Sequence, residues 1–358
     1  MKKYYERLGL EEGASRVDIK IAFEKLSKEL DPKNNNDLDF FREEYDLLVE
    51  AYNKLLGLND TFQESSTLMQ NDTNEKTKSF SKNNDLRKIK ISSGKPCLIV
   101  FLLDQSGSME DEWTKELGSK ANCLANYINQ IIREIGLKCM APEGSKVVVK
   151  NRFEIAVIGY GKESSVYSAF QGALSFESSE GFIHSIQSLF DKPYQYIDKK
   201  PVWITPSAFH KTPMTEAFNT AKDVIQSWIN WGNHSECHPP ILINITDGIP
   251  TDSGYKFELL IEAAEEIKDL HTVHGDAMIF NCHIDNSITD PILFPDNLNN
   301  IYDEYAKVMF EISSMLMPKM IEEANRKHYN LNHYSRGFAY NAGPKELIKF
   351  LQIGSSAA

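Results

Sequence analysis

The segment best suited to chemistry is Asp104-Gln105-Ser106-Gly107-Ser108, which follows an apolar run over residues 97–103. An uncharged run of that length predicts a strand buried on both faces, as in a parallel α/β sheet. Open α/β sheets bind their ligands at the carboxyl ends of the strands, which is where these polar side chains are expected. One carboxylate and two hydroxyls on a short turn offer three oxygen ligands, the type that hard cations such as Mg²⁺ prefer.

Two later segments carry side chains of the same kind. Thr212 lies in a loop before an expected helix, and Asp247 ends a second expected buried strand over 241–246. In a doubly wound sheet these segments can converge with Asp104 at the crevice where the strand order reverses. Apart from His210, no histidine or cysteine adjoins them to favour zinc. The expected ligands of a Mg²⁺ or Mn²⁺ ion are Asp104, Ser106, Ser108, Thr212 and Asp247.

Two other uses of the first segment compete with metal binding. Asp104 and Ser106 are also typical caps of a following helix. An aspartate after the first strand is, in addition, the nucleophile of haloacid-dehalogenase-type phosphatases, which need a second aspartate two residues on. Ser106 occupies that position and removes the general acid. The residues therefore favour binding over catalysis.

His234-x-x-Cys237-His238 is a second group of metal-ligating residue types. A zinc site needs further ligands at suitable spacing, and no second pair occurs, so we expect a polar loop before the strand at 241. The five cysteines form no Cys-x-x-Cys pair. Their number and spacing favour free thiols in a reducing cytosol over a disulfide framework.

The chain around these segments alternates apolar runs with helical periodicity, which predicts βαβ crossovers and a mostly parallel, doubly wound sheet flanked by helices. Besides the runs that end at 104 and 246, we expect strands at 153–160, 166–170 and 277–284. The expected helices cover 113–135, 182–190, 215–228, 256–270, 302–326 and 346–351.

A separate helical module is expected at residues 1–56. Ser15 and Asp18 form a capping-box pattern before an apolar face at helical spacing, and a breaker cluster at 31–37 precedes a second periodic stretch. Residues 57–90 are polar and turn-prone with few groups to bury, so they predict a flexible linker. The α/β domain then covers 91–358.

The α/β part resembles a von Willebrand factor A (vWA) domain with a metal-ion-dependent adhesion site. The resemblance rests on Asp-x-Ser-x-Ser at 104–108, Thr212-Pro213 and Thr246-Asp247-Gly248, and it extends over 95–355 through the segments 279–284, 294–296, 305–306, 313–314 and 336–342. It is most similar to bacterial cytoplasmic A domains of stress and tellurite-resistance systems, often associated with protein kinases and phosphatases. It implies that Ser106, Ser108 and Thr212 face the metal and that the two aspartates ligate it or hold its waters.

The same resemblance implies that an acidic side chain of a protein partner completes the metal coordination. Residues beside the site are expected to contact that partner: Met109, Lys211, Pro213 and Ile249. Lys211 stands where the family commonly has glycine. Its charge could attract a carboxylate or weaken cation binding, and the sequence leaves both open.

The N-terminal module resembles a J domain through Tyr4-Tyr5-Glu6-Arg7-Leu8 and the later Tyr45-x-x-Leu48-x-x-Ala51-Tyr52 pattern. J domains carry His-Pro-Asp between their long helices, and that tripeptide engages the DnaK-type chaperone. Asp31-Pro32-Lys33 replaces it here. We therefore expect a degenerate J-like module that docks a second protein, with a J-domain co-chaperone as the alternative.

The net charge of −12 argues against nonspecific binding to nucleic acid or to an anionic membrane. No apolar run approaches the roughly 20 residues that span a bilayer, and the first residues lack the apolar core of a signal peptide. The sequence thus predicts a cytoplasmic, noncatalytic, metal-dependent adaptor of a bacterial stress or defence-type system. Its partners would be proteins, with kinases, phosphatases and chaperone-system proteins as candidates, and a metal-dependent phosphatase is the weaker alternative.

Overall fold

A computed structural model of the 358-residue chain describes the following residues: 2–10, 13–15, 18–19, 22–23, 25–27, 47–49, 51–52, 54–55, 91–144, 146–162, 165–168, 182–209, 211–285 and 290–356. The chain divides into two compact units, Met1–Lys78 and Ser79–Ala358. The linker expected at 57–90 and the tripeptide at 31–33 lie outside the described residues.

The N-terminal unit begins with helix α1 (Lys2–Arg7). The Ser15 hydroxyl accepts a hydrogen bond from the Asp18 backbone N–H at 3.2 Å, and the Asp18 carboxylate accepts one from the Ser15 N–H at 3.3 Å. This reciprocal pair is the capping box that the sequence predicts. Leu8, Ile19 and Leu48 form a small buried cluster, so three chain segments pack together.

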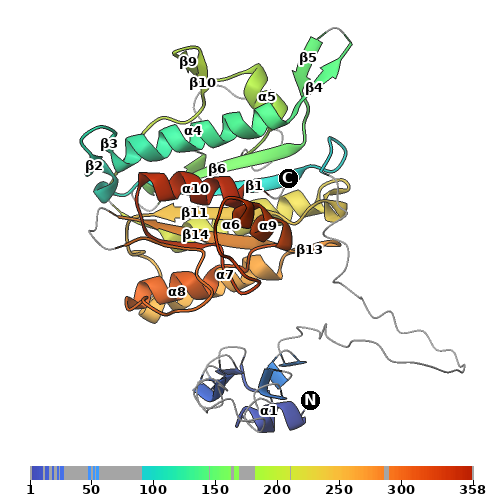
Figure 1. Ribbon diagram of the computed structural model, residues 1–358, viewed down its shortest axis with the longest axis vertical. Coiled ribbons are helices and arrows are strands. Elements are labelled where there is room, and N and C mark those ends of the chain that lie inside the picture. Colours follow the sequence, from blue (N-terminus) through green and yellow to red (C-terminus); the bar gives the residue numbers. More distant parts are fainter. Residues whose placement is uncertain are drawn as a thin grey trace, which may run out of the picture. The chain divides into compact units, whose positions relative to one another are not determined.

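The C-terminal unit is built on one sheet (Figure 1). Its described strands follow the spatial order β15, β16, β14, β11, β1, β6, β7, and β8 also pairs with β6. Their bounds are β1 Cys97–Asp104, β6 Phe153–Lys162, β7 Ser165–Ser168, β8 Ile183–Ser185, β11 Ile241–Thr246, β14 Met278–Ile284, β15 Ile292–Leu293 and β16 Phe338–Ala342.

The five central strands, from β16 to β6, are parallel, whereas β7, β8 and β15 pair antiparallel at the two sides. Numbered along the chain, the parallel strands lie in the order 2-1-3-4-5, which places the switch point between β1 and β11. The sequence-based expectation of a mostly parallel α/β sheet is confirmed.

Helices cover both faces of this sheet. Strand β1 alternates strictly, with Ile99 and Phe101 in one buried cluster and Val100 and Leu102 in the other. The first cluster includes residues of α4 (Lys120–Lys138), α5 (Ile186–Asp191), α9 (Pro318–Arg326) and α10 (Pro344–Gly354). The second includes residues of α6 (Met214–Asn230), α7 (Glu258–Asp269) and α8 (Glu304–Ile312). Figure 1 shows α4 and α10 on one side of the strands and α7 and α8 on the other.

Three expected helices differ from the structure. The helix expected over 182–190 begins at Ile186 as α5, because Ile183–Ser185 form strand β8 and the Ser185 hydroxyl caps the helix by accepting the Ser188 N–H. The helix expected from 113 begins at Lys120, because Glu112–Thr114 (β2) and Gly118–Ser119 (β3) form a small hairpin. Gly118 turns the chain with φ +78°, and the Ser119 hydroxyl caps α4 by accepting the Asn122 N–H. The helix expected over 302–326 is divided into α8 and α9, and Pro318 starts the second at the position where a missing N–H costs nothing.

The remaining described elements are short. The hairpins are β4 (Met140–Glu143) with β5 (Lys146–Val149), β9 (Gln195–Ile197) with β10 (Lys200–Val202), and β12 (His271–Thr272) with β13 (Gly275–Asp276). Single 3₁₀ turns are η2 (Gly107–Glu110), η3 (His234–Glu236) and η4 (Tyr255–Phe257). Within the described ranges, no helix combines the length and apolarity needed to cross a bilayer.

Candidate functional site

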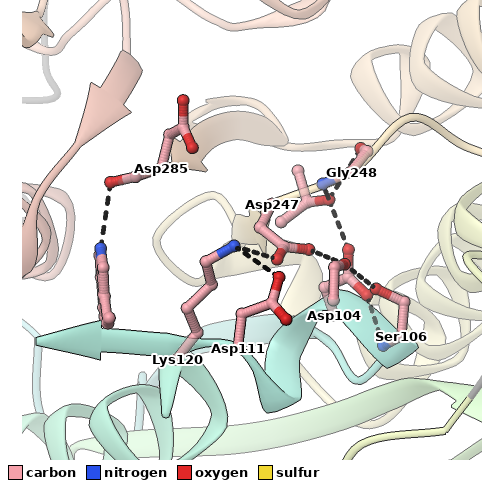
Figure 2. Close-up of polar contacts among 10 residues, drawn as sticks. Asp104, Ser106, Asp111, Lys120, Asp247, Gly248 and Asp285 are labelled. Atoms are coloured by element: carbon pink, nitrogen blue, oxygen red, sulfur yellow. Dashed lines mark hydrogen bonds and ion pairs between the residues drawn. The ribbon is translucent and has the colours of Figure 1, made fainter. Parts of the chain in front are cut away.

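The candidate site lies where β1 and β11 end, side by side, at the switch point of the sheet. The register Leu103↔Ile245 places Asp104 beside Thr246, and Asp247 follows directly. Figure 2 shows Asp104, Ser106, Asp247 and Gly248 gathered there. These residues come from two segments 139 to 142 positions apart in sequence that hydrogen bonds join directly. The convergence predicted for them is therefore present.

Asp104 shapes the turn that follows β1. Its Oδ1 accepts the Ser106 N–H at 2.8 Å, and its Oδ2 accepts the Thr246 hydroxyl at 2.6 Å. The side chain is fully buried, and this burial is the main reason why its pKa is raised to about 6, although the hydrogen bond from Thr246 opposes the shift. The helix-cap alternative does not describe Ser106, since its side chain makes no capping bond and α4 is capped by Ser119.

A chain of hydroxyls links Asp104's turn to the second carboxylate. Ser106 Oγ lies 3.1 Å from Ser108 Oγ, and the Ser108 hydroxyl donates to Asp247 Oδ1 at 2.7 Å. The turn thus presents both serine oxygens toward the end of β11. This is the arrangement of oxygen donors that the Asp-x-Ser-x-Ser spacing predicts.

Thr212 brings the third segment to the same place. A Cβ atom built on Gly248 would lie 3.6 Å from Thr212 Oγ1 and 3.9 Å from Asp104 Oδ2. The hydroxyl of Thr212 and the carboxylate of Asp104 therefore border the same small space, which a side chain at residue 248 would enter.

Two residues that the sequence did not single out hold Thr212 in place. Thr251 donates its N–H to the Thr212 carbonyl at 2.9 Å and accepts the Thr212 N–H on its hydroxyl at 3.3 Å. Asp252 accepts the N–H groups of Thr215 and Glu216, both at 3.0 Å, at the start of α6. The loop after β11 thus fixes the start of α6 and, with it, the position of Thr212 directly before that helix.

Gly161 allows the Thr212 loop to approach the end of β1. It has φ +155°, and a Cβ there would lie 2.2 Å from the Gln105 carbonyl oxygen, so no other residue fits without movement. The same carbonyl accepts the Phe209 N–H at 2.6 Å, and Gly161 O accepts the Lys211 N–H at 3.2 Å. These backbone bonds attach the loop to the ends of β1 and β6.

Lys120 is a further residue at the candidate site that the sequence does not single out. Its ammonium donates to Asp247 Oδ2 at 2.7 Å, with only 7% of its side chain exposed and none of the Asp247 side chain (Figure 2). A second carboxylate, Asp111 Oδ2, lies 4.0 Å from the same nitrogen and is largely exposed. Because the helix was expected to start at 113, residue 120 was placed inside it and not at its first turn beside the site.

The donor set agrees with a hard divalent cation in chemical type. It consists of two carboxylates and three hydroxyls, all oxygen, and it includes no thiol or imidazole. In the part of the chain that the structure describes, no group of three or more His, Cys, Asp or Glu side chains is placed to hold a metal. The formal charge of Asp104, Asp247 and Lys120 together is −1, so the site still attracts a cation.

The residues expected to meet a partner differ in accessibility. Lys211 and Ile249 are exposed, with Ile249 at 58%, whereas Pro213 is buried. Met109 is fully buried in the cluster under α4 and cannot touch a partner in this conformation. The surface beside the site is therefore formed by Lys211 and Ile249 and not by all four residues.

The second group of metal-ligating types lies apart from this edge. His234 Nδ1 contacts the Trp228 carbonyl at 2.9 Å and its ring stacks on Trp228. His238 Nδ1 lies 2.8 Å from the Pro239 carbonyl, and Cys237 Sγ lies 3.9 Å from the Asn233 carbonyl. Each side chain thus has a backbone partner, in α6 for His234 and in the loop before β11 for Cys237 and His238. This loop lies at the opposite end of β11 from Asp247.

Comparison with known proteins adds little to this geometry. No family model matches the chain, and no curated protein matches it. It is similar to proximal thread matrix protein 1 from the mussel byssus, with 14% identity and a TM-score of 0.32 over 62% of this chain and 42% of that one. It is also similar to the human COPII-coat protein Sec24c, with 12% identity and a TM-score of 0.27 over 57% of this chain and 27% of that one. The chain spans less than half of either protein, and TM-scores this low support no argument about fold or function.

Proposed function

We propose that the C-terminal unit is a noncatalytic, divalent-cation-dependent protein-binding module of the vWA type. The observation that carries the proposal is the meeting of Asp104, Thr212 and Asp247, from three separate segments, at the carboxyl end of a parallel sheet. Mg²⁺, or Mn²⁺ with the same preference for oxygen, would be held by the two aspartates, Ser106, Ser108 and Thr212.

A bound cation would supply a coordination position for an acidic side chain of a partner. Lys211 and Ile249 are exposed beside the site and offer one charged and one apolar contact to that partner. A binding role also suits Asp104 better than nucleophilic catalysis, because both of its oxygens accept hydrogen bonds within the chain. We accordingly expect no hydrolysis of a generic phosphomonoester.

Two matched threonine variants test the cation site. Thr212→Val removes the hydroxyl that borders the Asp104 carboxylate, whereas Thr215→Val removes an equally buried hydroxyl three residues later that has no partner among the described atoms. Calorimetric titration should show Mg²⁺ binding to the wild type and to Thr215→Val, and at least about tenfold weaker binding to Thr212→Val. Absence of Mg²⁺ and Mn²⁺ binding to the folded wild type would disprove the proposal.

Partner binding is tested with the same pair of variants on an affinity resin. A specific partner should be retained by the wild type and by Thr215→Val, released by EDTA, and restored when Mg²⁺ is added back. Thr212→Val should fail to retain it. Retention of the same protein by all three chains in EDTA would show that binding does not use the metal site.

We further propose that the N-terminal unit is a J-like helical module that docks a second protein. This is supported by its capping box at Ser15 and by the stacking of Phe23 on Tyr52, whose ring centroids are 4.0 Å apart. A J-domain co-chaperone is the alternative. The ATP turnover of a DnaK-type chaperone separates the two, because a docking module leaves the rate unchanged whereas a co-chaperone raises it with the full chain and not after deletion of residues 1–56.

A further inference from the structure

Lys120 places its side-chain nitrogen inside the site. Its ammonium is 2.7 Å from Asp247 Oδ2, and both side chains are almost or wholly buried. A buried ion pair of this kind persists because each charge compensates the desolvation of the other. One of the oxygens proposed to hold the cation is thus already engaged by the protein's own ammonium.

A second acceptor for this ammonium is close at hand. Asp111 Oδ2 is 4.0 Å from Lys120 Nζ, and the Lys120 N–H donates to the Asp111 carbonyl at 3.0 Å, which keeps the two residues adjacent. Asp111 is largely exposed, so its carboxylate can turn toward the lysine at little cost. A short rotation of the lysine side chain therefore exchanges a buried partner for an exposed one.

We infer that Lys120 sets the cation affinity of the site by competing with the divalent ion for Asp247. The inference rests on the proposed function and deepens it. When the cation binds, the ammonium of Lys120 leaves Asp247 and pairs with Asp111. The lysine thereby compensates the buried carboxylate in the absence of metal and weakens metal binding by the free energy of the broken pair.

The charge balance supports this exchange. Asp104, Asp247 and Lys120 sum to −1, so a divalent ion brings the three residues to +1, whereas the two carboxylates alone would be neutralised fully. Two cations cannot share one buried carboxylate without repulsion in a medium of low dielectric constant. Movement of the ammonium toward Asp111 increases its distance from the ion and places it nearer to solvent.

The decisive experiment compares Mg²⁺ affinity in Lys120→Met, Lys115→Met and the wild type by calorimetric titration. Lys120→Met keeps the length of the side chain and removes its charge, and Lys115→Met removes an exposed lysine from the neighbouring hairpin. Coupling energies of close charge pairs lead us to expect about tenfold or more tighter binding by Lys120→Met and no change in Lys115→Met.

The outcomes separate this inference from the proposed function. Equal Mg²⁺ affinity in the wild type and in folded Lys120→Met overturns the inference and leaves the metal site standing. Binding by neither protein overturns both. Binding by Lys120→Met alone supports the competition of Lys120 for Asp247 and overturns the proposed function, because the wild-type chain would then bind no cation.

Asp111→Asn provides the second test, because Asp111 is exposed and its replacement does not threaten folding. Without this carboxylate the displaced ammonium loses its partner, so Mg²⁺ should bind several-fold more weakly. Glu110→Gln removes the neighbouring exposed carboxylate and is the control for general electrostatics. If Asp111→Asn and Glu110→Gln changed the Mg²⁺ affinity equally, the inference that Lys120 moves to Asp111 would be wrong.

Discussion

Strand β1 has a buried ionisable side chain at each end. The protein accommodates these two side chains in opposite ways, by keeping one neutral and by pairing the other with polar and charged groups. The strand begins at Cys97 and ends at Asp104, and neither residue has any exposed surface. Cys97 lies beside His238, and Asp104 lies beside Asp247 and its lysine. Cys97 and Asp104 are therefore equally buried and differ in the residues beside them.

At the amino end, burial keeps both groups neutral. Desolvation raises the pKa of the Cys97 thiol and lowers the pKa of His238 to about 4. The two are 3.6 Å apart, but His238 Nδ1 carries its hydrogen toward the Pro239 carbonyl at 2.8 Å and so cannot accept the thiol proton. A cysteine beside a histidine is here a packing pair and not a reactive thiolate.

At the carboxyl end, burial is balanced by opposite charge. Asp247 accepts a hydrogen bond from the Lys120 ammonium at 2.7 Å. The remaining carboxylate oxygens of Asp247 and Asp104 accept hydrogen bonds from the Ser108 hydroxyl, the Thr246 hydroxyl and the Ser106 backbone N–H. The difference teaches that burial alone does not create a site. A binding site also needs a buried charge whose partner can be replaced. In the proposed site, that charge is Asp247, the partner is Lys120, and the replacing ligand is the cation.

Removal of the charge at Asp247 should have the largest effect. In EDTA, Asp247→Asn takes the buried partner from the Lys120 ammonium and leaves only the exposed carboxylate of Asp111, a weaker partner. We expect a loss of roughly 3 kcal/mol in unfolding free energy, measured by urea denaturation. Adding Lys120→Met to Asp247→Asn should recover most of that loss, since no charge then stays unpaired. The exposed Asp276→Asn serves as the control and should change stability by less than about 0.5 kcal/mol. If Asp247→Asn and Asp276→Asn lowered the unfolding free energy equally, the ion pair at Asp247 would have no special importance. The contrast between the amino and carboxyl ends of β1 would then be lost.

His238 should give the amino end a distinctive pH dependence. Its folded pKa of about 4 is below its unfolded value of 6.5, so between these values the unfolded chain binds a proton that the folded chain does not. Its stabilising contribution is complete above pH 6.5 and declines as pH falls toward 4. Relative to His238→Gln, the wild type should lose roughly 2 to 3 kcal/mol of unfolding free energy between about pH 7 and about pH 4.5.

The measurement is urea denaturation of both proteins at the two pH values in EDTA. Groups other than His238 titrate in both chains and cancel in the difference. A difference that does not change with pH would mean that His238 takes up its proton in the folded state, and the amino end would then carry charge as the carboxyl end does.

The sheet and the convergence of the oxygen donors could be predicted from the sequence for a simple reason. Strand β1 is an apolar run that ends in Asp104, and the mainly apolar strand β11 is followed directly by Asp247. Parallel strands bring their carboxyl ends to one edge of the sheet. Local pattern and three-dimensional arrangement agree at these residues. The prediction of Asp104, Thr212 and Asp247 as neighbours needed no knowledge of side-chain contacts.

Lys120 could not be predicted, because its role depends on where a helix begins. Trp113 and Leu117 continue the apolar spacing of α4 backwards, although Trp113 is buried from a strand and bonds through its indole N–H to the Asp285 carbonyl at 3.1 Å. The turn at Gly118 decides the helix start. Strand β16 is not among the strands predicted from the sequence, because it is only five residues long and Asn341 within it has φ +52°.

The smallest expected effect tests whether the two ends of β1 act independently. Cys97→Ala deletes one buried atom and should lower the unfolding free energy by about 1 kcal/mol. Mg²⁺ affinity should stay unchanged, because Cys97 and Asp104 stand at opposite ends of an eight-residue strand, roughly 23 Å apart. Thr212→Val should show the opposite pattern, with a clear loss of Mg²⁺ affinity and little loss of stability. If Cys97→Ala weakened Mg²⁺ binding as strongly as Thr212→Val, the strand would transmit changes between its ends, and binding at one end would depend on packing at the other.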